Sequence, residues 1–169
     1  MVIYLCYDTY MKFFSYLYLA LLLILFGLFY WEISPVAEYV NHYQTQLTLY
    51  FLDIGLGEGR LQGVDIMINP HYKVIVTKAC NGMIPVLVLL AAVLAYPVSW
   101  IHKARWIVMG YVILSAMNLF RLLMVANFVK KQADFPLYHD LFGNLLLMAT
   151  GLLLFYLFLR GTRSYRLMR

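Results

Sequence analysis

The sequence predicts an all-α membrane protein, a four-transmembrane-helix bundle with an extracytoplasmic amphipathic helix and a small β-hairpin between the first two spans. Of its 169 residues, 64% are hydrophobic and only 12% are charged, which leaves too little polar surface for a soluble domain. Four long stretches carry almost no charge, and basic residues gather in one short connection and in the C-terminal tail. We therefore expect one integral membrane domain over residues 1–169.

Four apolar stretches are the candidate spans: residues 13–31, 82–101, 106–129 and 141–159. Each comes close to or exceeds the ~20 residues that a helix needs to cross a ~30 Å hydrocarbon core. The first stretch follows Lys12 and has no small-residue cleavage site, so we expect an uncleaved anchor rather than a signal peptide.

Charges in the short connections predict the orientation of the spans. The turn after the second span and the tail after the fourth must share one side, and each holds a basic cluster: His102, Lys103 and Arg105, and Arg160, Arg163, Arg166 and Arg169. The positive-inside rule makes this side cytoplasmic. We expect a multi-pass protein of the cytoplasmic membrane with both termini inside and residues 32–81 and 130–140 outside; Lys130 and Lys131 oppose this weakly.

The net charge of +5 does not indicate a nucleic-acid partner. No nucleic-acid-binding motif accompanies it, and the arginines of the tail directly follow an apolar stretch. A basic cluster in that place favours anionic lipid, so the expected partner of the tail is the lipid bilayer.

The outer segment, residues 32–81, is too long for a plain connection. Ser34 and Pro35 have the pattern of a helix N-cap and a first-turn proline. Residues 33–54 then mix apolar and polar side chains, which predicts a partly amphipathic helix lying on the membrane surface. Glycines end this helix: Gly55, Gly57 and Gly59.

A β-hairpin is predicted between this helix and the second span. Residues 60–69 and 72–78 are rich in β-branched side chains, and Asn69-Pro70 lies between them as a turn. The second strand of the hairpin leads directly toward Cys80.

Three polar side chains need an explanation, and the predicted topology brings them to one membrane face: Cys80, Arg121 and His139. Arg121 lies within a span, where a charge costs ~2.5–3.5 kcal/mol and usually serves function. It is some 12 Å from the end of the span, so its side chain can reach the membrane interface only with strain. Cys80 lies at a helix N-terminus, where thiol pKa values fall, although alone it also fits a small buried apolar residue. His139 can take and return a proton, although alone it also fits an interfacial helix cap.

Four neighbours are candidate substrate-binding or supporting residues: Asn81, Gly82, Asn118 and Asp140. Gly82 lets the backbone approach a substrate closely. Asn118 is on the helix face of Arg121, where it orients the guanidinium, contacts substrate or bonds a neighbouring helix. Asp140 either caps the last helix or orients His139, and we favour the cap. The other histidines have no zinc-like spacing, so we expect no metal and no cofactor.

These residues resemble the exosortase/archaeosortase family of multi-pass membrane transpeptidases. The resemblance covers about residues 60–159 and rests on Ala79-Cys80-Asn81-Gly82-Met83 at one span entry, Asn118-x-x-Arg121 in the next span and His139 opening the last. It implies that Cys80 is the nucleophile, His139 the acid/base and Arg121 the electrostatic partner. It also implies membrane-anchored protein substrates with a C-terminal sorting signal, cut at the outer face and passed to a surface acceptor. This chain is shorter than many relatives, which have more spans before the cysteine.

Two other classes of protein stay open. A non-catalytic membrane scaffold would pair Arg121 with Asp140 or with a partner, and replacing Cys80 would leave its pathway intact. A small transporter subunit organised around Arg121 would show flux that depends on Arg121 and not on Cys80. The sequence has no inverted repeat and no second charge within a span, which disfavours the transporter.

Overall fold

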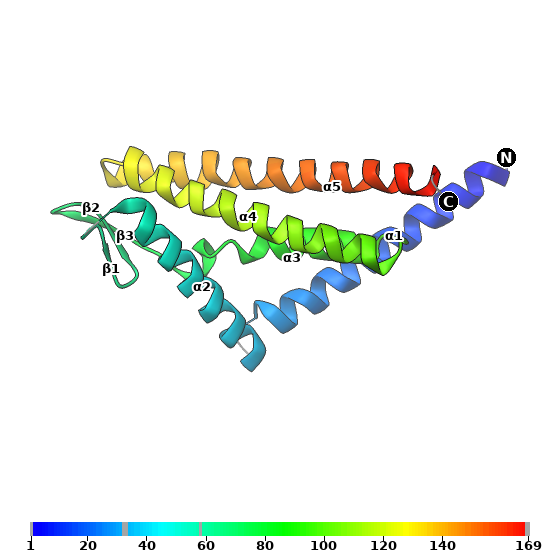
Figure 1. Cartoon of the computed structure of the whole chain (residues 1–169), viewed down its shortest axis with the longest axis horizontal. Helices are drawn as coiled ribbons and strands as arrows, with labels where there is room; N and C mark the ends of the chain where they lie inside the picture. Colours follow the sequence, from blue (N-terminus) through cyan, green and yellow to red (C-terminus); the bar gives the residue numbers. More distant parts are fainter. Residues whose placement is uncertain (1, 32–33, 58, 168–169) are drawn as a thin grey trace.

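The computed structural model describes residues 2–31, 34–57 and 59–167, and it is mostly helical (Figure 1). Within these residues, three helical stretches are long and apolar enough to cross a membrane: Met11–Phe29, Trp100–Phe128 and Gln132–Thr162. They agree with the first, third and fourth predicted spans, as expected of a membrane protein. Arg169 of the basic tail and residues 32–33 of the outer segment lie outside the described residues.

Four helices form the bundle: α1 (Val2–Phe29), α3 (Met83–Ala95), α4 (Trp100–Phe128) and α5 (Asn144–Leu167). α4 and α5 run side by side in opposite directions, and α3 packs against α1, α4 and α5 (Figure 1). α1 begins and α5 ends at the same end of the molecule, and the strands lie at the opposite end. This arrangement agrees with chain ends that share one side of a membrane, and which side that is stays a prediction.

The second predicted span, residues 82–101, is shorter than expected. α3 has 13 residues and extends about 20 Å, less than the ~30 Å of a hydrocarbon core. Pro97 explains the early end, because the residue before a proline is pushed out of the helical region, and Tyr96 is extended at φ −79° and ψ 132°. Residues 100–101 already belong to α4. The count of four spans therefore stays a prediction that depends on α3.

α2 (Pro35–Leu56) forms where a helix was predicted, and Ser34 caps it by accepting a hydrogen bond from the Ala37 N–H at 3.4 Å. Its two faces are mixed, and the buried face carries apolar residues that include Leu49, Leu52 and Leu56. The buried face also carries three polar side chains, Asn41, Gln44 and Thr48. Its exposed face carries rings: Tyr39, Tyr43, Tyr50 and Phe51. Aromatic rings favour a membrane interface, and the position of α2 on the membrane surface stays a prediction.

The predicted hairpin is part of a three-stranded antiparallel sheet with the order β1-β2-β3. β2 (Asp65–Asn69) and β3 (Tyr72–Ile75) are the two predicted strands, and Ile66 pairs with Val74 so that both face the core. β1 (Leu61–Gln62) adds a third strand, which was not predicted because two residues are too few to show an alternating pattern.

The largest core cluster joins the sheet to α2 and α4 beside Cys80. Its buried members come from all of these elements: Leu49, Leu52, Leu56, Ile66, Val74, Val76, Cys80, Leu122, Val125, Ala126 and Val129. The sheet thus fixes the segment that leads into the cysteine against the end of the bundle.

Candidate active site

Cys80 ends a single 3₁₀ turn, η1 (Lys78–Cys80), between β3 and α3. Its N–H donates to the Thr77 carbonyl oxygen at 2.8 Å, and its side chain is buried. Gly82 follows with φ +76°, a left-handed conformation that glycine adopts without a steric penalty. The thiol is therefore carried by a hydrogen-bonded turn between the sheet and a helix, and Gly82 lets the chain turn into α3.

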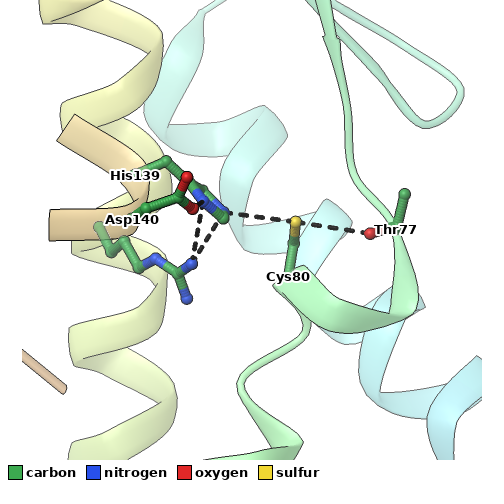
Figure 2. Close-up of polar contacts among 5 residues, drawn as sticks. Thr77, Cys80, His139 and Asp140 are labelled. Atoms are coloured by element: carbon green, nitrogen blue, oxygen red, sulfur yellow. Dashed lines mark hydrogen bonds and ion pairs between the residues drawn. The ribbon is translucent and has the colours of Figure 1, made fainter. Parts of the chain in front are cut away.

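The Cys80 thiol and the Arg121 guanidinium both contact one atom of the His139 imidazole. Cys80 Sγ lies 3.6 Å from His139 Nε2, and Arg121 Nη2 lies 2.8 Å from that same nitrogen. All three side chains are buried, with Arg121 4% exposed although it carries a full charge. The sulfur faces the imidazole across the space between η1 and the start of the last helix (Figure 2). The structure thus brings together three residues that α4, η1 and η3 (Pro136–Gly143) supply separately.

His139 is oriented by an aromatic ring stacked on its imidazole and by a contact at its second nitrogen. It lies in η3, a π-helical segment. Such segments are rare in proteins, and those that occur are often found at functional sites. Phe135 stacks on the imidazole with ring centroids 4.6 Å apart and 15° between the planes. Asp140 Oδ1 lies 2.7 Å from Nδ1, which directs Nε2 toward the thiol (Figure 2).

The favoured interpretation of Asp140 as a helix cap is wrong. The last helical run begins at Pro136, five residues before the predicted span, so Asp140 lies inside it and Phe135 occupies the N-cap position. The carboxylate contacts His139 instead, which is the alternative that the sequence left open.

The environment of Cys80 favours the thiolate. Burial alone raises the pKa of the thiol, but hydrogen bonds with His139 and with the backbone and hydroxyl of Thr77 lower it, and the balance brings the pKa from 9.0 to about 7. The Thr77 hydroxyl lies 3.7 Å from the sulfur. The nucleophilic thiolate is therefore more accessible at neutral pH than that of an ordinary cysteine.

Asn118 supports the cysteine rather than the arginine. Its Nδ2 donates to the Cys80 carbonyl oxygen at 2.8 Å. The contact requires Gly82, since a Cβ there would lie 2.8 Å from Asn118 Cγ. The close approach at Gly82 that the sequence suggested is thus made, in this structure, by Asn118.

Gly143 has the same role for Arg121, and the sequence pattern did not indicate it. A Cβ at Gly143 would lie 2.7 Å from Arg121 Nε. The missing side chain lets α4 and the last helix approach closely enough for the guanidinium to reach His139.

Two polar atoms beside the thiol are buried without a hydrogen-bond partner, Arg121 Nε and Asn118 Oδ1. Buried polar groups are nearly always paired, so each such exception calls for an explanation. One donor and one acceptor are therefore free beside the reactive group.

A cavity of about 470 Å³ opens directly from the site. Ala79, Gly82 and Arg121 line its inner end. From there it follows α3 as far as Ala92 and α5 as far as Phe155, and nearly all its walls are apolar. The site thus continues into an apolar groove between helices.

A buried polar network behind Cys80 was not anticipated from the sequence. Asn41 and Gln44 lie in the helix predicted over residues 33–54, and Tyr111 lies in the span predicted over residues 106–129. In the structure Asn41 and Gln44 bond Asn81, the residue after the cysteine, and Tyr111 bonds Gln44. No sequence signal distinguishes them, because the contacts join α2, α4 and the cysteine turn across long separations.

The described residues contain no group of three or more His, Cys, Asp or Glu side chains placed to hold a metal ion. His42 and His102 lie on α2 and α4, and His71 lies in the turn between β2 and β3. None of them belongs to the site around His139.

The fold and the site together place the chain in the class of helical membrane proteins with a buried cysteine, histidine and arginine. These three residues lie at the end of the bundle opposite the start of α1. A family model described as transmembrane exosortase matches residues 3–156, and the chain therefore belongs to the exosortase family, whose members are membrane cysteine peptidases and transpeptidases. The resemblance drawn from short motifs is confirmed and extends over a longer part of the chain. No curated protein and no solved structure gives a significant match.

Proposed function

We propose that the chain is a membrane-embedded cysteine transpeptidase that cuts the C-terminal sorting signal of an exported protein at the extracytoplasmic face of the cytoplasmic membrane. The signal consists of a short motif, a transmembrane helix and a basic tail, and the new C-terminus passes to a surface acceptor. One observation carries the proposal: the Cys80 thiol and the Arg121 guanidinium both contact Nε2 of His139. A nucleophile beside a base that a third group orients is the arrangement that covalent catalysis needs.

The reaction begins with transfer of the Cys80 thiol proton to His139 Nε2. The thiolate attacks the scissile carbonyl carbon, the C–N bond breaks, and His139 returns the proton to the leaving amine. A thioester then joins Cys80 to the substrate. The acceptor's amine or hydroxyl, or water, attacks the thioester as His139 takes its proton, and the thiol is restored when that proton returns to sulfur.

Arg121 stabilises the negative charge that forms in this sequence. Its Nε has no partner, and Nη2 contacts a nitrogen that must take a proton. The guanidinium is therefore placed to donate to the thiolate or to the oxyanion of the tetrahedral intermediate, an effect of ~3–4 kcal/mol for a single good donor. Low exposure strengthens the interaction, because water does not screen it.

The groove supports a substrate that is itself anchored in the membrane. It extends from Gly82 to Ala92 along α3, about 15 Å at 1.5 Å per residue. Its walls are apolar, and Arg121 lines the end nearest the thiol. An apolar segment next to the scissile bond fits these walls, whereas a wholly polar peptide does not.

The test is co-expression of the chain with a candidate substrate that carries the three-part signal, followed by mass spectrometry of the substrate's C-terminus. Wild type should release the signal, and Cys80→Ala should abolish release. Cys6→Ala removes the other cysteine of the chain and should leave release unchanged. The mass of the product distinguishes an added acceptor from a free carboxylate.

Release of the signal by Cys80→Ala at the wild-type rate would exclude Cys80 as the nucleophile. A host pathway that stays intact with this variant would instead indicate the scaffold. Flux that is lost with Arg121→Gln but kept with Cys80→Ala would indicate the transporter.

A further inference from the structure

A buried network of polar side chains holds the residue that follows Cys80. Asn81, Asn41 and Gln44 are 1%, 5% and 3% exposed. Burial of a polar group is costly unless its hydrogen bonds are satisfied, so a helix that turns Asn41 and Gln44 inward needs a reason. The mechanism proposed above uses none of these side chains.

Asn81, the residue after Cys80, is held at three of its polar groups. Its carbonyl oxygen accepts from Gln44 Nε2 at 3.2 Å, and its side-chain Nδ2 donates to Asn41 Oδ1 at 3.0 Å. Its Oδ1 accepts from the N–H of Met83 at 2.9 Å, which ties it to the start of α3. The peptide that follows the nucleophile therefore has little freedom to move.

The partners of Asn81 are themselves anchored to other helices. Asn41 Nδ2 donates to the Phe29 carbonyl oxygen, at the end of α1, and to that of Ala37, both at 2.7 Å. Gln44 Oε1 accepts from the Tyr111 hydroxyl on α4 at 2.6 Å. The network thus connects the cysteine turn to α1, α2 and α4 at once.

We propose that Asn41, Gln44 and Tyr111 are positioning residues, which hold the Asn81 peptide and thereby keep the Cys80 sulfur within reach of His139. The contact between the sulfur and Nε2 is 3.6 Å, near the outer limit for a hydrogen bond to sulfur, so a small movement of the turn breaks it. This inference rests on the proposed function only in taking Cys80 as the nucleophile.

The thiol itself reports on its position. The test uses the full-length chain in detergent with Cys6→Ser, so that Cys80 is the remaining thiol, and measures its rate of alkylation by iodoacetamide from pH 5 to pH 10. The charged or titratable groups that face the sulfur are His139 and Arg121, with Asp140 behind the imidazole. None of the variants used here changes them.

Two variants remove links of the network. Gln44→Met keeps the length of the side chain and loses both of its hydrogen bonds, and Tyr111→Phe loses only one hydroxyl. Both should move the midpoint of the alkylation profile up from about 7 toward 9, and the rate at pH 7 should fall about tenfold for Gln44→Met and several-fold for Tyr111→Phe. Thr48→Val is the matched control, since Thr48 is buried on the same helix and its hydroxyl bonds only the Gln44 carbonyl.

Thermal unfolding of each variant separates positioning from simple stability. If Gln44→Met and Tyr111→Phe lower the unfolding temperature but keep the wild-type midpoint, the network only stabilises the fold and the proposal is overturned. If Gln44→Met does not fold, Tyr111→Phe decides alone. Unchanged profiles beside a substrate that is still cut would overturn the positioning role and leave the proposed function standing.

Discussion

Nη2 of Arg121 lies 2.8 Å from Nε2 of His139, the same nitrogen that faces the thiol. An arginine only donates hydrogen bonds, so this contact exists while Nε2 carries a lone pair and the proton of the ring is on Nδ1, beside Asp140. Once Nε2 takes the thiol proton, the guanidinium loses its acceptor there. It is then free to turn to the new negative charge on sulfur or on the substrate oxygen.

The rate of Cys80 alkylation should rise with pH through a midpoint near 7. The thiolate is the reactive form, and its pKa is lowered to about 7, so reactivity is lost as the pH falls through that value. His139→Ala removes the hydrogen bond that lowers the pKa and should shift the midpoint toward 9. Measurement of iodoacetamide incorporation by mass spectrometry checks this. A midpoint at or above 9 in the wild-type chain would contradict it.

Arg121→Gln should slow cleavage of the substrate by about 10²–10³-fold, because it removes a preorganised charged donor from a buried site. Arg121→Lys keeps the charge but not the planar group with its several donors, so it should recover only part of the rate. Initial rates of product formation give the comparison. The matched control is Arg60→Gln, since Arg60 donates to the Asn127 side chain and to the Ala126 carbonyl in the last turn of α4 rather than to His139. Equal rates for wild type and Arg121→Gln would show that the guanidinium has no role in the reaction.

Gly143→Ala should reduce activity at least tenfold without unfolding the chain. The added Cβ would lie 2.7 Å from Arg121 Nε, so the guanidinium must move away from His139. Gly27→Ala is the control, because Gly27 lies within α1 and a Cβ there has no neighbour within 4 Å. Cleavage rates and unfolding temperatures of both variants are the measurements. A fully active Gly143→Ala would show that the close approach of the two helices is not needed.

The sequence could predict which three residues converge because membrane crossing restricts the chain to few arrangements. Hydrophobic stretches and loop charges were enough to place Cys80, Arg121 and His139 at one end of the bundle. The same signals misjudged α3, since hydropathy continues through Pro97 while the helix does not. Hydropathy predicts the length of the apolar stretch, whereas Pro97 decides where the backbone leaves the helix.

Side-chain partners could not be predicted in the same way. A span that begins at residue 141 predicts Asp140 as its cap, whereas Pro136 starts a π-helical segment that turns the carboxylate onto Nδ1 of His139. Gly143 has no side chain whose chemistry could mark it as functional. Only the three-dimensional structure reveals that the absence of a side chain makes room for Arg121. The inward position of Asn41 and Gln44 could not be predicted, because polarity alone does not tell which side of a helix meets a polar neighbour.

α2 turns Asn41 and Gln44 inward and exposes four rings: Tyr39, Tyr43, Tyr50 and Phe51. If α2 lies at the membrane surface, as predicted, these rings contact lipid or detergent rather than water. A detergent that interacts poorly with aromatic rings should destabilise this helix. The hydrogen bonds of Asn41 and Gln44 with Asn81 would then transmit the change to the turn that carries the Cys80 sulfur. The choice of lipid or detergent should therefore change the reactivity of the Cys80 thiol. Variants are best compared in one and the same lipid or detergent mixture.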